Sequence, residues 1–82
     1  MNSVYMRPSP DGKTMITIFR TNVVERQQAQ FIINELQQRF PGARFSFDLW
    51  DCDRVFRMEA ADDIVGAVVG FFKDEGLLCE IL

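Results

Sequence analysis

The hydrophobic residues of this chain change their spacing several times, and each spacing is typical of one kind of secondary structure. Residues 15–20 are rich in β-branched and aromatic side chains, which predicts a strand. Apolar residues occupy both of its alternating sets, with Met15 and Phe19 on one and Ile16 and Ile18 on the other. A strand with two apolar faces lies in the middle of a sheet or is covered on both sides.

The next segment has the period of a helix. Its apolar residues recur at intervals of three and four, which predicts an amphipathic helix from Val24 or Glu25 to about Phe40. We expect Thr21 or Asn22 to cap its N-terminus, and residues 41–42 (Pro-Gly) to end it.

Strict alternation returns in the middle of the chain. Residues 44–50 alternate apolar and polar side chains, which predicts a strand with one buried and one solvated face. The acidic residues 51–53 turn the chain, and Val55 to Ala60 forms the returning strand of a hairpin.

A second helix and a last strand complete the pattern. Asp62 or Asp63 is expected to cap the helix and Gly76 to end it, before a strand over residues 77–82. Gly66 and Gly70 lower the intrinsic helicity by about 1 kcal/mol each relative to alanine. Their spacing predicts a close approach between this helix and the sheet beneath it.

The order strand, helix, strand, strand, helix, strand predicts an α+β domain over residues 15–82. Right-handed crossovers give a ferredoxin-like sandwich, in which a four-stranded antiparallel sheet of order 4-1-3-2 carries both helices on one face. Residues 1–14 are expected to form a flexible N-terminal leader.

Charge and hydropathy exclude two classes of partner. The nine basic residues are scattered among twelve acidic ones and the net charge is −3, so no basic cluster predicts nucleic-acid binding. No apolar run reaches the roughly 18 residues that a membrane-spanning helix needs. We therefore expect a cytoplasmic protein that binds neither nucleic acid nor membrane.

The two cysteines are expected to be free thiols. Cys52 lies in the hairpin turn and Cys79 on the last strand, at the opposite edge of the predicted sheet and beyond disulfide reach. Asp51, Cys52 and Asp53 are weak candidates for metal ligands, since the turn lacks the glycine and distal glutamate of a calcium loop. Cys52 is otherwise a small turn residue, and we favour this interpretation because the neighbouring aspartates disfavour the thiolate, which is the reactive form of cysteine.

The first helix permits a comparison with a known family. The fold and helix pattern over residues 15–82 resemble the heavy-metal-associated (HMA) family, whose Met-x-Cys-x-x-Cys motif precedes a helix with apolar residues four and eight positions after the second cysteine. Placing those positions on Ile32 and Leu36 puts Val23, Glu25 and Gln28 where the family has its methionine and cysteines. Copper(I) prefers thiolate ligands, so the resemblance implies the fold without copper binding, and no cofactor is expected.

Two stretches, residues 19–23 and 48–53, are also similar to a group of small bacterial HMA-like proteins of unknown role. This similarity assigns no activity.

An interaction or oligomerisation domain is the leading functional hypothesis. If the helices cover one face of the sheet, either Ile16 and Ile18 or Met15 and Phe19 lie on the open face, joined by Trp50 and Val55. An apolar patch of this kind usually marks an interface with a protein partner or a second copy. The alternative is a few exposed apolar residues without consequence.

A small-ligand or divalent-metal sensor is the second hypothesis. The topology brings the loop after the first strand, the hairpin turn and the turn at Gly76 to one end of the sheet. Polar groups for such a site come from Thr21, Asn22 and Glu25, together with the acidic turn at residues 51–53. The alternative is ordinary helix capping beside a solvated turn.

An enzyme is the third hypothesis and the one we do not expect. Acylphosphatases share the fold, but residues 21–24 do not reproduce their glycine-bearing phosphate loop. The chain has no histidine for general acid–base catalysis and no serine-centred nucleophile motif.

Overall fold

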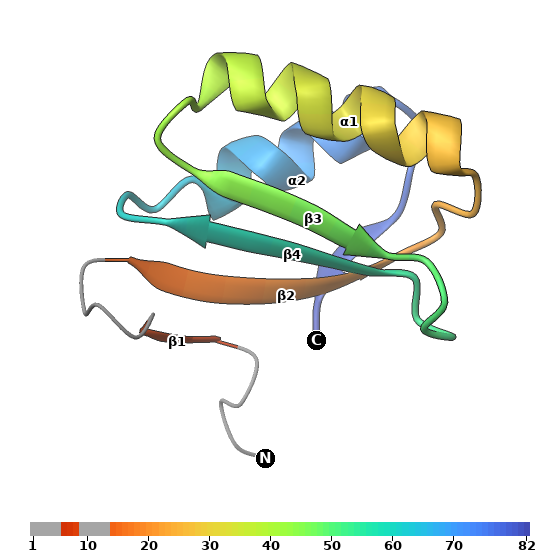
Figure 1. Cartoon of the computed structure of the whole chain (residues 1–82), viewed down its shortest axis with the longest axis horizontal. Helices are drawn as coiled ribbons and strands as arrows, with labels where there is room; N and C mark the ends of the chain where they lie inside the picture. Colours follow the sequence, from red (N-terminus) through yellow and green to blue (C-terminus); the bar gives the residue numbers. More distant parts are fainter. Residues whose placement is uncertain (1–5, 9–13) are drawn as a thin grey trace.

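The computed structural model describes residues 6–8 and 14–82, which form one antiparallel sheet and two helices (Figure 1). The elements follow in the order β1 (Met6–Pro8), β2 (Met15–Thr21), α1 (Arg26–Arg39), β3 (Arg44–Asp48), β4 (Val55–Ala60), α2 (Val65–Asp74) and β5 (Cys79–Ile81).

Strand β2 is the centre of the sheet. It pairs with β4 along Met15–Phe19, and on its other side it pairs with β5 along Phe19–Thr21. Strand β3 pairs with β4, so the four main strands are ordered β5-β2-β4-β3. This is the predicted order 4-1-3-2, and the predicted α+β, ferredoxin-like arrangement is confirmed.

Strand β1 lies within the segment that was expected to be a flexible leader. Residues 6–8 pair antiparallel with residues 15–17 of β2, although residues 1–14 were expected to be unstructured. The short β5 leaves this part of β2 without a neighbour on that side, so its backbone groups are available for pairing. The remaining leader residues, 1–5 and 9–13, lie outside the described residues.

The core lies between the helices and one face of the sheet. Phe56 on β4 is at its centre, with ring centroids 5.8 Å from Phe19, 4.7 Å from Phe47 and 5.2 Å from Phe72 of α2. From α1, the residues Ala29, Ile32 and Leu36 are buried against the same cluster. The helices therefore cover the Phe19 side of β2, and Ile16 and Ile18 lie on the open face.

The helix ends only partly follow the predictions. The N-cap of α1 is Glu25, without a side-chain cap, so the prediction that Thr21 or Asn22 caps this helix is wrong. The N-cap of α2 is Ile64, also without a side-chain cap, so the prediction that Asp62 or Asp63 caps this helix is wrong. Asp63, one residue earlier, accepts a hydrogen bond from the N–H of Val65 at its Oδ1 at 3.3 Å. Gly76 ends this segment with a left-handed φ of 74°, as glycine permits without strain.

The close approach predicted at Gly66 and Gly70 is wrong. A Cβ atom built on either glycine has no heavy atom within 4 Å, apart from its chain neighbours and the backbone of its own helix. The buried side of α2 carries Val68, Phe71 and Phe72, and both glycines lie on the opposite side of the helix.

No helix in the described residues is long and apolar enough to cross a membrane.

Replacing either helical glycine with alanine is expected to stabilise the domain. Gly70→Ala and Gly66→Ala each add helix propensity worth up to about 1 kcal/mol, with open space for the methyl group. Thermal unfolding measures the effect, and Gly76→Ala is the matched control because its positive φ makes alanine strained there. A loss of stability in Gly70→Ala would contradict the open surface of α2.

Candidate functional site

Thr21 ties the loop after β2 to the β3–β4 hairpin. Its backbone N–H donates to the carbonyl of Asp53 at 3.0 Å, and its hydroxyl donates to the carbonyl of Arg54 at 2.7 Å. The same hydroxyl oxygen accepts the N–H of Val23 at 3.2 Å. Thr21 is only 6% exposed, so its side chain is a structural tie and is not presented to a ligand.

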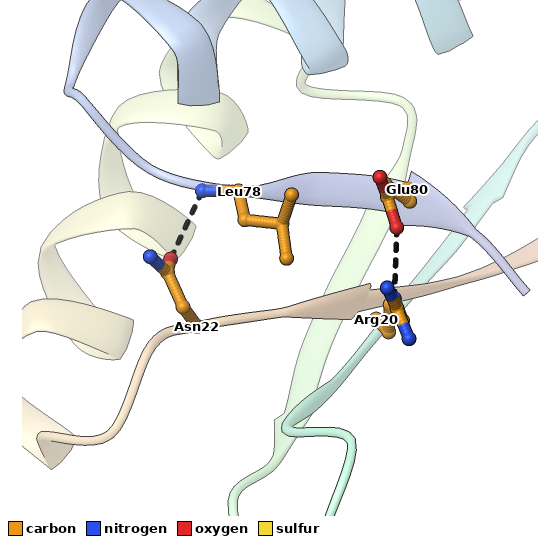
Figure 2. Close-up of polar contacts among 4 residues, drawn as sticks. All are labelled: Arg20, Asn22, Leu78 and Glu80. Atoms are coloured by element: carbon orange, nitrogen blue, oxygen red, sulfur yellow. Dashed lines mark hydrogen bonds and ion pairs between the residues drawn. The ribbon is translucent and has the colours of Figure 1, made fainter.

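Asn22 and Arg20 tie the same region to the last strand (Figure 2). Asn22 Oδ1 accepts the N–H of Leu78 at 2.9 Å, and Arg20 Nε lies 2.8 Å from Glu80 Oε1. Glu25, the third predicted ligand residue, is exposed and contributes its backbone carbonyl to the start of α1. The structure thus brings the predicted loops together, but through contacts that hold the fold.

The hairpin turn has its own internal support. Arg54 adopts a φ of 47°, a left-handed conformation that is uncommon for a residue with a side chain. Its N–H donates to the carbonyl of Asp51 at 3.0 Å, and its Nη1 donates to the carbonyl of Leu49 at 2.7 Å. These bonds and the one from Thr21 hold the turn in this conformation.

The predicted metal candidates do lie together. Asp51, Cys52 and Asp53 offer ligand atoms within 4.8 Å of one another. However, Asp51 Oδ1 already accepts the N–H of Asp53 at 2.9 Å, and Asp51 and Cys52 are exposed to solvent. The three residues come from a single turn, and exposed acidic groups of this kind are common without an ion.

The two cysteines are free, as expected. Cys52 is exposed on the hairpin and Cys79 is buried on β5. Burial, with a smaller contribution from neighbouring Glu80, raises the pKa of the Cys79 thiol to about 12. Cys79 therefore stays protonated and unreactive near neutral pH, in agreement with its predicted place in the core.

The open face of the sheet is less apolar than predicted. Ile16, Ile18 and Val55 lie on it and are half-buried. Their partners across the β2–β4 and β3–β4 ladders are charged: Glu59 opposite Ile16, Arg57 opposite Ile18 and Asp48 opposite Val55. Among the described residues, this face therefore mixes charged and apolar side chains.

Trp50, the fourth predicted interface residue, lines a different surface. A groove of about 480 Å³ runs between the start of α1 and the end of β3. Trp50 is 90% exposed at this groove and Val24 is 60% exposed. The apolar side chains that line it are Val24, Ala29, Ile33, Phe47, Leu49 and Trp50.

The groove adjoins a free sheet edge. Strand β3 has five residues, and β4 is its only partner among the described strands, while α1 runs along one face of β3 (Figure 1). Alternate N–H and C=O groups of β3 therefore point away from the sheet, as at any edge strand. Among the described strands, β1 and β5 at the other edge have only three residues each.

The sequence contained one signal for this groove that the predictions missed. In the alternating segment 44–50, Trp50 falls on the solvated set, where a large aromatic side chain is unusual. The predicted strand over residues 44–50 is two residues too long, because β3 ends at Asp48 and the Asp48 carboxylate accepts the N–H of Trp50 at 3.1 Å. Trp50 therefore belongs to the turn and to the groove.

Comparison of the chain with protein-family models, with curated proteins and with solved structures gave no match. The fold is thus established by the structure, whereas the resemblance to the heavy-metal-associated family stays a prediction.

Removing the Thr21 hydroxyl is expected to destabilise the domain. Thr21→Val keeps the shape of the side chain but leaves the Arg54 carbonyl and the Val23 N–H without their partner, at a cost of about 1–3 kcal/mol. Urea unfolding measures the loss, and Thr21→Ser, which keeps the hydroxyl, is expected to lose less. If the valine variant unfolds like the wild type, Thr21 is not the tie between these loops.

Proposed function

We propose that this chain is a non-enzymatic protein-interaction domain that binds an extended protein segment along β3. The observation that carries the proposal is Trp50, which is 90% exposed beside a partly apolar groove and a strand edge that no other described strand covers. Tryptophan is enriched among the residues that contribute most to protein–protein binding.

The groove offers a place for apolar side chains. Val24 and Trp50 are exposed at its rim, and half-buried Ile33, Phe47 and Leu49 line it. Covering these side chains removes apolar surface from water, which contributes roughly 25 cal/mol for each Å². The lining also includes the polar residues Arg26, Gln30 and Asp48. A concave surface that combines apolar side chains with a few polar ones is typical of a binding site.

The free edge offers backbone hydrogen bonds beside the groove. An extended segment that adds to β3 pairs with its outward N–H and C=O groups, while alternate side chains of the segment point toward the helix layer. This mode of binding needs no charged cluster and no cofactor, in keeping with the composition of the chain.

Other features support a role without catalysis. The chain has no histidine, the Cys79 thiol is buried with a raised pKa, and the polar groups of Thr21 and Asn22 hold the fold. As part of the same proposal, we expect no copper binding and a cytoplasmic location, where two free thiols stay reduced.

A selection from a random-peptide display library tests the proposal. We expect immobilised protein to enrich peptides with alternating apolar and polar residues. Trp50 is the only tryptophan, so its fluorescence reports occupation of the groove by a synthetic tryptophan-free version of an enriched peptide. Trp50→Ala should weaken peptide binding at least about tenfold, as measured by titration calorimetry.

Phe31→Ala is the matched control for this experiment. Phe31 is an aromatic residue of α1 that is 47% exposed but does not line the groove, so its removal should leave peptide binding unchanged. Failure to enrich any peptide, or equal losses in the two variants, would contradict the proposed site.

A further inference from the structure

We infer that the segment bound along β3 is β3 of a second copy, paired antiparallel about a twofold axis at Ser46. This inference rests on the proposed function, because it uses the same edge and groove. It adds the identity of the partner and the register of the contact.

The sequence of β3 is complementary to itself when the strand is reversed. In an antiparallel pair centred on Ser46, Arg44 stands opposite Asp48 of the partner subunit, and Asp48 stands opposite the partner's Arg44. Phe45 stands opposite the partner's Phe47 in the same way. Opposite charges and aromatic pairs in directly facing positions both stabilise paired strands.

The register within one copy places these groups on suitable faces. Arg44, Ser46 and Asp48 are exposed on the open face, where they lie opposite Glu59, Arg57 and Val55 of β4. Phe45 and Phe47 point to the helix side, where Phe47 lines the groove. The pairing thus forms two ion pairs on the open face and two aromatic contacts beside the groove.

The charges needed for this contact are available. The ion pairs among the described residues are Arg20–Glu80 and Arg39–Glu35, so neither Arg44 nor Asp48 takes part in one there. Asp48 Oδ1 accepts the N–H of Trp50, which leaves Oδ2 for a partner guanidinium. A planar guanidinium and a carboxylate make a short, charge-assisted contact.

The same charges select one arrangement. Parallel pairing in register places Arg44 opposite Arg44 and Asp48 opposite Asp48, and like charges in facing positions destabilise paired strands. An antiparallel pair shifted by two residues leaves a charged residue opposite serine. Only the pair centred on Ser46 matches both charges, and its twofold symmetry closes the assembly at two copies.

Charge exchange between β3 residues tests this pairing. Sedimentation of the whole chain should show a dimer for the wild type and a dissociation constant raised about tenfold or more for Arg44→Asp and for Asp48→Arg. An equimolar mixture of these two variants should dimerise again. In the mixed pair the introduced Asp at position 44 faces the introduced Arg at position 48 at one end, and native Asp48 faces native Arg44 at the other. The double variant R44D/D48R should also dimerise.

The control makes the same arginine-to-aspartate change on β4, away from the sheet edge. Arg57→Asp alters the open face on β4, beside Ser46, and should leave the dimer unchanged. Circular dichroism of every variant separates loss of pairing from loss of fold, and recovery of the dimer in the mixture requires that both variants are folded.

A wild-type chain that stays monomeric at high micromolar concentration, or a dimer that ignores the charge exchange, would overturn the inference. The proposed function is tested separately from the dimer, because the peptide selection does not require the chain to dimerise. A monomer that still binds peptides through Trp50 would leave the interaction domain in place with a partner other than itself.

Discussion

The position of β2 in the middle of the sheet is the constraint on which the other features depend. Strand β4 occupies one side of β2, and β5 and β1 share the other side. The hairpin partner β3 is thereby left at the edge, where β4 is its one neighbour within the part of the chain that the structure describes. A free edge pairs with other strands unless it is short, covered or charged. The charges at the two ends of β3 have opposite signs, so they attract a second β3 that pairs antiparallel.

The other end of β2 explains why the loops are a poor site for a ligand. Thr21 is the last residue of β2, and its backbone and hydroxyl bind the hairpin, while neighbouring Asn22 binds the connection to β5. Thr21 and Asn22 therefore join three connections: the loop between β2 and α1, the β3–β4 hairpin and the segment between α2 and β5. The side chains of Thr21 and Asn22 therefore hold loops of the fold, and their hydrogen-bonding groups are not left for a ligand.

The sequence predicted the fold better than the site, for physical reasons. Strand order follows from the helical and alternating periods, and buried Cys79 follows from its place in a strand. The predicted capping of α1 is wrong because Thr21 and Asn22 form hydrogen bonds with residues distant in sequence, which no local pattern reveals. Glycine spacing does not show which side of a helix faces the sheet, and alternation does not show that β3 ends before Trp50.

The central claim is that β3 of one copy pairs with β3 of another. Isotope-filtered nuclear Overhauser spectroscopy, on a mixture of labelled and unlabelled protein, tests it most directly because it detects only contacts between copies. Pairing between the two β3 strands predicts contacts from Phe45 of one copy to Phe47 of the other, and between the two Ser46 residues. Contacts between copies that instead involve Ile16 and Ile18 would place the interface on the open face and contradict this pairing.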